Sequence, residues 1–313
     1  MTTIPIVFAF DNNWILPAAV CIYSLFANAN ENTEYDVYFL YPQKSPLATS
    51  YLERIFEVFP RHKAKYIGIG DDFDKAFQIR GINTLTYYRL LISDLLPEYD
   101  KVIYSDVDVI FQDDLSEIYL NTELSGKYLG VVNSLAQFDK DRQNYYKYRL
   151  QLDTTKIFYA GNIIINAKEI REARLKDKFM SMIETKYKFQ DMDILNITCQ
   201  GKVTFLPPEF CVTTYFCDIA INNPEKLSSI WTKTEVDKAF SNGIIHYNGQ
   251  KPWKGWCPNF DIWWEYYRKS PVFDHNYYFE FFNSRLNELD QLPLLKRIKI
   301  LMRYFVYGIR KNT

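Results

Sequence analysis

The sequence lacks any hydrophobic run long enough to cross a bilayer. Its longest apolar stretch, from Ile15 to Ala27, has 13 residues and contains Pro17, whereas a membrane-spanning helix needs about 20 residues. The first residues also lack the lysines and arginines that begin a secretory signal peptide. We therefore expect a soluble, cytoplasmic protein.

Cysteine is scarce, and neither sign of charge dominates. Five cysteines without a Cys-x-x-Cys pair argue against a disulfide framework and against a zinc knuckle. The net charge is −1, but residues 291–313 carry six basic side chains and no acid, which leaves −7 on the remaining 290 residues. Because a protein that binds nucleic acid needs a basic face, no nucleic-acid partner is expected.

The basic end has the pattern of an amphipathic helix. On a helical wheel one face holds Leu294, Ile298, Leu301, Met302, Phe305 and Ile309, and another holds Lys296, Lys299, Arg303 and Arg310. This pattern is typical of a helix that lies on an anionic membrane surface, here the inner face of the membrane; a helix packed on the domain is the alternative. We expect one domain over residues 1–270 and a helical appendage with this basic tail over residues 271–313.

The first part of the chain alternates between strand and helix patterns. Apolar runs predict strands at Ile4–Phe10, Tyr35–Tyr41, Lys65–Ile69 and Lys101–Tyr104, with helices predicted at Ile15–Ala29, Leu47–Phe59 and Tyr87–Leu96. Such alternation indicates an α/β fold with a mostly parallel central sheet. Later patterns predict strands at Tyr128–Asn133, Ile157–Asn166 and Gly243–Tyr247 and helices at Ala167–Tyr187 and Asp191–Cys199.

Asp106-Val107-Asp108 is the strongest chemical signal. It follows the apolar run 102–104 and precedes another apolar pair at 110–111, and buried carboxylates are costly unless they are paired or bind a metal. Two carboxylates at a strand end can bind one hard divalent cation that keeps positions open for phosphate oxygens. An ordinary structural turn is the alternative.

His246 begins a second polar cluster, which runs to Trp253. It is one of three histidines and ends a short apolar run, and imidazole joins carboxylates around manganese-like ions. Gly249 would let the backbone approach a phosphate, and Lys251 would supply a positive charge for it. A core histidine before an ordinary turn is the alternative.

Two further segments offer polar side chains for a substrate. Asp11-Asn12-Asn13-Trp14 places hydrogen-bonding groups beside a large ring, which suits a nucleobase, although Asp and Asn are also favoured as helix N-caps. Gln190-Asp191-Met192-Asp193 opens a predicted helix with two carboxylates. These either stabilise the helix dipole or contact substrate hydroxyls.

Taken in this order, the segments resemble those of glycosyltransferase family 8. Its members are metal-dependent, retaining enzymes that transfer galactose or glucose from a UDP-sugar, and they include bacterial lipooligosaccharide α-galactosyltransferases and glycogenin. The resemblance runs from Ile4 to Trp264 and includes 7–13, 87–90, 102–108, 160–166, 190–196 and 246–253. It implies a GT-A-type nucleotide-sugar-binding domain that acts on a glycan, glycolipid or glycoprotein acceptor in the synthesis of bacterial cell-surface glycans.

The resemblance also implies a metal and phosphate site. Asp106, Asp108 and His246 would hold Mn²⁺ or Mg²⁺ against the diphosphate of UDP-galactose or UDP-glucose. Gly249 and Lys251 would contact the phosphates. The other nucleotide contacts, including the uracil and ribose, would come from Ala9, Asp11, Asn13, Trp14 and Val107.

The same resemblance assigns the sugar site, where this chain departs from the family. Arg89 and Asp191 would contact the donor sugar and take the catalytic roles. The family usually has Asn where this chain has Tyr159, and it commonly has Gln, a candidate amide nucleophile, where this chain has Met192. The spacing from the histidine of the metal site to Lys251 is also one residue shorter than the commoner pattern.

Two other functions fit parts of the sequence. A phosphohydrolase of the haloacid dehalogenase type would use Asp106 as nucleophile and Asp108 as acid, but that family places its motif on the first strand, and three predicted strands precede it here. A non-catalytic nucleotide-sugar-binding protein is the third possibility, kept open by Tyr159 and Met192. We predict a retaining transferase that forms an α-linkage.

Overall fold

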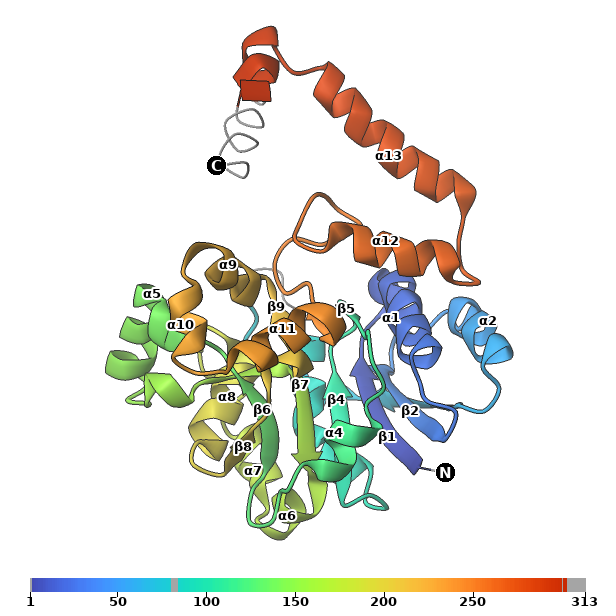
Figure 1. The fold of residues 1–313 in the computed structure, drawn as a ribbon. Helices are drawn as coiled ribbons and strands as arrows, with labels where there is room; N and C mark the ends of the chain where they lie inside the picture. The colour runs from blue at the N-terminus through green and yellow to red at the C-terminus, as the bar shows by residue number, and fades with distance from the viewer. Residues whose placement is uncertain (1, 80–83, 300, 303–313) are drawn as a thin grey trace. The chain divides into compact units, whose positions relative to one another are not determined.

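The computed structural model describes residues 2–79, 84–299 and 301–302 and divides the chain into two units. The first unit is Met1–Val272 and the second is Phe273–Thr313 (Figure 1). All the predicted site residues lie in the first unit.

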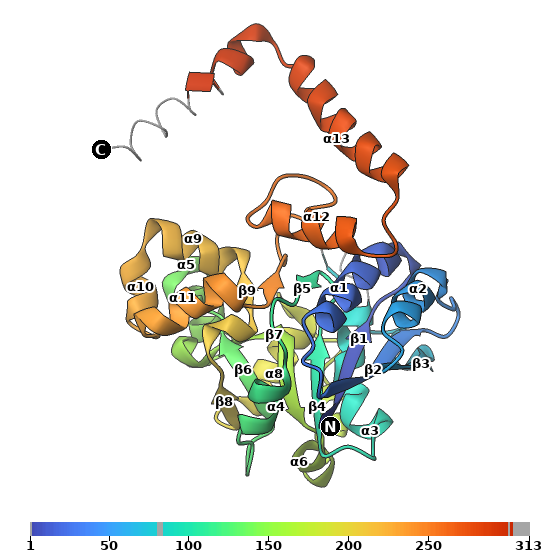
Figure 2. The same cartoon turned by 45° about the vertical axis from the view of Figure 1, so that its right-hand side comes forward.

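A seven-stranded sheet runs through the first unit in the order β3-β2-β1-β4-β7-β6-β8 (Figures 1 and 2). Its strands are β1 (Thr2–Ala9), β2 (Thr33–Pro42), β3 (Lys63–Ile69), β4 (Lys101–Ser105), β6 (Leu129–Asn133), β7 (Phe158–Asn166) and β8 (Val203–Phe205). Neighbouring strands pair in parallel except at β7, which is antiparallel to both β4 and β6. The predicted mostly parallel α/β sheet is confirmed.

Apolar side chains cover both faces of this sheet. On one face, Phe26 of α1 (Ile15–Ala27) contacts Tyr35 of β2 and Phe56 of α2 (Ser50–Val58). The core of the other face is formed with η3 (Thr84–Leu91), α3 (Ile92–Leu95), α6 (Ala167–Glu172), α7 (Leu175–Met180) and α8 (Gln190–Cys199). The inner strands β1, β2, β4, β6 and β7 are largely buried on both sides, which is why they read as continuous apolar runs.

A small second sheet joins three segments that are far apart in sequence. Its strands are β5 (Val109–Ile110), β10 (Ile245–His246) and β9 (Val212–Thr213), in the order β5-β10-β9. His246 pairs with Val109 on one side and with Thr213 on the other. This pairing carries the histidine of the second polar cluster to the loop that follows β4.

Shorter elements complete the first unit. The α-helices are α4 (Ser116–Asn121), α5 (Lys140–Asn144), α9 (Thr214–Asn222), α10 (Pro224–Ser228), α11 (Lys233–Asn242) and α12 (Phe260–Lys269). The 3₁₀ turns are η1 (Asn12–Trp14), η2 (Asp71–Phe73), η4 (Ala136–Phe138), η6 (Thr154–Lys156) and η7 (Pro208–Phe210), and η5 (Tyr145–Arg149) is a π-helical turn.

Two predicted helices need correction. The single helix predicted at Ala167–Tyr187 is wrong, because α6 and α7 are separated at Arg174, whose φ of 51° is left-handed. Ile170 and Phe179 are both in the core, and nine residues of straight helix would turn them about 180° apart. The helix predicted at Tyr87–Leu96 begins as the 3₁₀ turn η3 and is α-helical only in α3.

The second unit contains α13 (His275–Asp290) and a helical stretch over residues 294–299. Its exposed apolar side chains include Leu294, Leu295, Ile298, Leu301 and Met302. No helix in the described part of the chain has the length and hydrophobicity to span a membrane. The rest of the predicted amphipathic helix, with Phe305, Ile309, Arg303 and Arg310, lies outside the described residues.

Candidate active site

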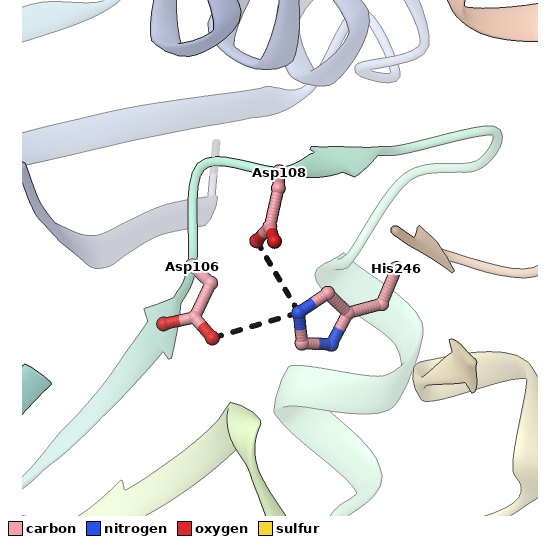
Figure 3. A group of neighbouring side chains, drawn as sticks. All are labelled: Asp106, Asp108 and His246. Carbon is pink, nitrogen blue, oxygen red and sulfur yellow. Dashed lines mark ion pairs between the residues drawn. The ribbon is translucent and has the colours of Figure 1, made fainter. Parts of the chain in front are cut away.

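Three side chains that can bind a metal meet beyond the carboxyl end of β4 (Figure 3). Asp106 follows β4, Asp108 precedes β5, and His246 reaches both from β10. Its Nε2 atom lies 3.5 Å from Oδ2 of Asp106 and 3.3 Å from Oδ1 of Asp108. One ligand atom from each of the three residues lies within 4.8 Å of the others, and Asp108 and His246 are buried.

The residues of this cluster fit a divalent cation. Mn²⁺ and Mg²⁺ accept carboxylate oxygens, Mn²⁺ also accepts imidazole nitrogen, and three protein ligands leave positions for phosphate oxygens. Gly161 of β7 provides the space. A Cβ at position 161 would lie 2.2 Å from Cε1 of His246 and 2.8 Å from Oδ2 of Asp106, so any larger residue would displace a ligand.

The charges of the cluster depend on one another. Lys251 forms an ion pair with Oδ2 of Asp108. Burial opposes ionisation of Asp108, but Lys251 and His246 hold the pKa of this carboxyl well below its ordinary value. Burial likewise disfavours a charged His246, yet Asp108 raises the pKa of the imidazole to about 10. Asp108 therefore favours the protonated imidazole, and a bound cation would take the place of that proton.

Arg89 of η3 connects this cluster to a second buried carboxylate. Its Nη2 donates to Oδ1 of Asp106 at 2.9 Å, and its Nε lies 3.0 Å from Oδ2 of Asp191. The Tyr104 hydroxyl donates to the same oxygen of Asp106 at 2.8 Å. Oδ1 of Asp106 thus accepts two hydrogen bonds from the protein, while its Oδ2 faces His246. The Arg89 side chain is 4% exposed, so it is part of the wall of the site.

The two carboxylates at the start of α8 have different surroundings. Asp191 faces the Arg89 guanidinium, and burial raises the pKa of this carboxyl to about 6 although Arg89 acts to lower it. Asp193 is fully buried, and its Oδ2 accepts the Tyr145 hydroxyl at 2.6 Å and the N–H of Phe189 at 2.9 Å. Asp193 is therefore engaged in hydrogen bonds within the protein, while Asp191 lies beside the candidate site.

The predicted nucleotide segment follows β1. The parallel register of β1 and β4 puts Ala9 level with the start of the metal-binding loop. Asp11 is the N-cap of η1 and accepts the N–H of Asn13 at 3.0 Å, so the N-cap interpretation is confirmed for this residue. Trp14 packs edge-on against Trp253, with ring centres 5.8 Å apart, which joins this segment to the one that begins at the metal-binding histidine.

The sequence also singles out Gly249, Val107 and Tyr159, and the structure gives their surroundings. A Cβ on Gly249 would lie 3.4 Å from Oγ1 of Thr214, an ordinary contact. Val107 is buried between the two aspartates. The hydroxyl of Tyr159 accepts from Oγ1 of Thr213 at 3.3 Å and from Nη1 of Arg142 at 3.5 Å.

The sequence prediction missed the roles of Tyr104 and Gly161. A signal for the first was present, because residues two apart on a strand share a face, which puts Tyr104 on the side of Asp106. The role of Gly161 depends on its distance to His246, and a local sequence pattern cannot predict a distance between residues so far apart in the chain. Elsewhere in the described chain, a cavity of about 440 Å³ lies among α4, η7 and α11 and is lined by none of these residues.

Comparison with known protein families matches residues 5–257 to glycosyl transferase family 8. The match covers most of the chain and includes Asp106, Asp108 and His246. The chain belongs to glycosyl transferase family 8. The resemblance seen in the sequence is confirmed, and the haloacid dehalogenase alternative is excluded.

Relatives among curated proteins are distant. The lipopolysaccharide 1,2-glucosyltransferase of Escherichia coli is 26% identical over 181 residues, which are 55% of this chain and 49% of that protein. A Haemophilus influenzae relative is 27% identical over 67% of this chain and 64% of its own length. This family 8 chain therefore spans between about half and two thirds of the length of these relatives.

Solved structures establish the fold. The structure of an active-site mutant of LgtC matches with a TM-score of 0.71 at 23% identity, over 88% of this chain and 99% of LgtC. The bifunctional glycosyltransferase WbbM matches with a TM-score of 0.72 at 23% identity, over 90% of this chain and 51% of WbbM. This family 8 chain has the GT-A fold that the sequence predicted.

Proposed function

We propose that this family 8 protein transfers galactose or glucose from a UDP-sugar to a hydroxyl of a glycan, glycolipid or glycoprotein, and forms an α-linkage with retention. The observation that carries the proposal is the cluster of Asp106, Asp108 and His246 at the carboxyl end of a central strand. Open α/β sheets bind their ligands at that edge. The similarity to the lipopolysaccharide 1,2-glucosyltransferase of Escherichia coli supports a lipopolysaccharide-like acceptor.

The cluster supplies the charge that a departing nucleotide needs. Mn²⁺ or Mg²⁺ held by the three ligands would stabilise the negative charge that builds on UDP as the sugar leaves. Lys251 forms an ion pair with Asp108, and a diphosphate would compete for its ammonium group. Arg89 and Tyr104 fix Oδ1 of Asp106, so the ligand geometry is set before the substrate binds.

The sugar-facing residues favour a single front-face step. The bond from the anomeric carbon to the UDP oxygen breaks, the acceptor oxygen bonds to that carbon on the same face, and the acceptor proton passes to the departing phosphate oxygen. Asp191 would accept hydroxyl groups of the donor sugar. A covalent intermediate needs a nucleophile below the anomeric carbon; Met192 has an uncharged thioether, and Asp193 is bound to Tyr145.

A screen of UDP release tests the proposal. The full chain with Mn²⁺ is incubated with several UDP-sugars and candidate acceptors, and any product is analysed by NMR. We expect release from UDP-galactose or UDP-glucose and an α-linked product from the α-configured donor. A β-linked product would contradict retention, and no transfer from any UDP-sugar would leave the non-catalytic binding protein as the better account.

A further inference from the structure

Beside the metal cluster lies an arginine held between aromatic side chains. In both views α5 lies beside α9 (Figures 1 and 2), and the guanidinium carbon of Arg142 lies 4.8 Å from the ring centre of Tyr215. Nη1 of Arg142 donates to the Tyr159 hydroxyl at 3.5 Å and to the carbonyl of Ser134 at 3.3 Å. The ring, the hydroxyl and the carbonyl hold the guanidinium at a fixed position.

This arginine is joined to the metal site through two residues. Tyr159 and Gly161 share a face of β7, because alternate residues of a strand point the same way, and a Cβ on Gly161 would point at His246. The Tyr159 hydroxyl bonds to Thr213, and Thr213 pairs with His246 between β9 and β10. The guanidinium therefore lies on the same side of the sheet as the metal cluster.

The charge of Arg142 is only partly compensated. In the described chain its one ion pair is with Asp139, where Nε lies 3.8 Å from Oδ2, and its Nη2 donates no hydrogen bond. The side chain is 23% exposed, so a ligand can reach it. A fixed guanidinium with unused N–H groups favours a carboxylate or a phosphate, which it can bind through two hydrogen bonds.

We infer that Arg142 binds an anionic group, a carboxylate or a phosphate, that one of the two sugar substrates carries. The inference rests on the proposed function, since it requires a UDP-sugar at the metal cluster. The group is either a carboxylate on the donor, as a uronate in place of galactose or glucose, or a phosphate or carboxylate on the acceptor. Both present the same chemistry to the guanidinium. Tyr159, which stands where the family usually has Asn, is the residue that positions it.

Calorimetry with two matched pairs of ligands tests the inference on the full chain with Mn²⁺. The donor pair is UDP-glucuronate and UDP-glucose; the acceptor pair is glucose 6-phosphate and glucose, measured with UDP already bound. We expect the anionic member of one pair to bind at least about tenfold more tightly than its neutral partner. The pair that shows the preference identifies which substrate carries the charge.

The variant Arg142→Gln should remove that preference and leave the affinity for UDP unchanged. Arg149→Gln is the matched control, because it removes the same charge from η5, where the side chain is exposed and donates to the Lys186 carbonyl at 3.4 Å. It should keep the preference. If Arg142→Gln does not fold, Arg142→Lys carries the test and should lose most of the preference, since lysine lacks the planar fork.

Three results would overturn the inference. These are no preference within either pair, a preference that survives in Arg142→Gln or in full in Arg142→Lys, and an equal loss in Arg149→Gln. Intact binding of UDP without any preference contradicts the inference alone. Failure of UDP and Mn²⁺ to bind the wild-type chain contradicts the proposed function, and the inference with it.

Discussion

Among single residues, Gly161 leaves the space in which Asp106 and His246 meet. A Cβ there would lie 2.2 Å from Cε1 of His246 and 2.8 Å from Oδ2 of Asp106, and β7 is held on both sides by β4 and β6, so the backbone cannot move away. We expect Gly161→Ala to fold and to bind Mn²⁺ about ten- to a hundredfold more weakly, as when residues that orient metal ligands are changed. Titration followed by electron paramagnetic resonance measures this.

Gly130→Ala is the matched control on the neighbouring strand β6. A Cβ there would lie 3.2 Å from Cγ2 of Thr122 and 3.4 Å from Cβ of Ile164, a tight contact with no metal ligand. This variant should lose some stability and keep its affinity for Mn²⁺. Equal affinities in the two variants would contradict the role assigned to Gly161.

The acids at the start of α8 should separate catalysis from stability. Asp191→Ala removes a carboxylate beside the candidate sugar site, and we expect a loss of about 2–4 kcal/mol of transition-state stabilisation, measured as kcat/KM.

Asp193→Asn instead disturbs the hydrogen bonds to Tyr145 and Phe189 and should lower the free energy of unfolding by about 1–3 kcal/mol. Met192→Gln should stay within about tenfold of the parent activity.

Trapping of the donor sugar on Asp193 would overturn the front-face mechanism and leave retention standing. An Asp191→Ala variant with parental kcat/KM would remove Asp191 from the sugar site.

The meeting of Asp106, Asp108 and His246 could be predicted from the sequence because their residue types, their place after strands and their resemblance to a family agree. The ion pairs that surround these three residues could not be predicted from the sequence. Arg89 meets Asp106 across 17 positions and Lys251 meets Asp108 across 143, and such pairs depend on how strands align in space. Arg142 gave no signal at all, because its neighbours Tyr159 and Tyr215 come from two other elements.

At the scale of elements, His62 links α1 and β2. Its ring stacks on Phe26 of α1 with centres 4.0 Å apart, and its Nδ1 accepts the N–H of Tyr35 at 3.0 Å. Burial first, and then the charge of Arg61, lower the pKa of His62 to about 4 from its ordinary 6.5. The folded protein therefore holds this histidine neutral.

Stability should depend on pH through this residue. Because the pKa is lower in the folded state, the contribution of His62 is complete above pH 6.5 and is lost as the pH falls toward 4. Between pH 7 and pH 5 we expect it to reduce the free energy of unfolding by about 1–2 kcal/mol. Urea unfolding at both values compares the wild type with His62→Gln, which does not titrate; equal pH slopes in the two proteins would refute the prediction.

The strands of the central sheet could be predicted more closely than the helices that cover it. Strands buried on both faces are continuous apolar runs, so β2, β4 and β7 differ from their predicted ranges by one or two residues at an end. The break at Arg174 could not be predicted, since it lets Ile170 and Phe179 enter one core. The antiparallel direction of β7 likewise follows from its partners and not from its own residues.

At the scale of the whole molecule, the basic tail should decide membrane contact. Each basic residue near an anionic leaflet contributes about 1 kcal/mol, and residues 291–313 hold six of them. We expect a chain that ends at Asp290 to lose binding to vesicles with phosphatidylserine, because it lacks these six basic residues. The truncated chain keeps the whole first unit. Neither protein should bind neutral vesicles. Sedimentation with the vesicles measures the binding of both proteins. If the truncated chain binds as well as the full chain, the alternative of a tail packed on the domain is favoured.

Metal-dependent transfer from a UDP-sugar is the central claim, and Asp108→Asn tests it most directly. This variant keeps the shape of the side chain and removes the charge that pairs with Lys251 and faces His246. With the best UDP-sugar and Mn²⁺, we predict that kcat/KM falls at least about a hundredfold. We also predict that EDTA abolishes wild-type transfer and that added Mn²⁺ restores it. Full activity in EDTA, or a variant as active as the parent, would contradict the account.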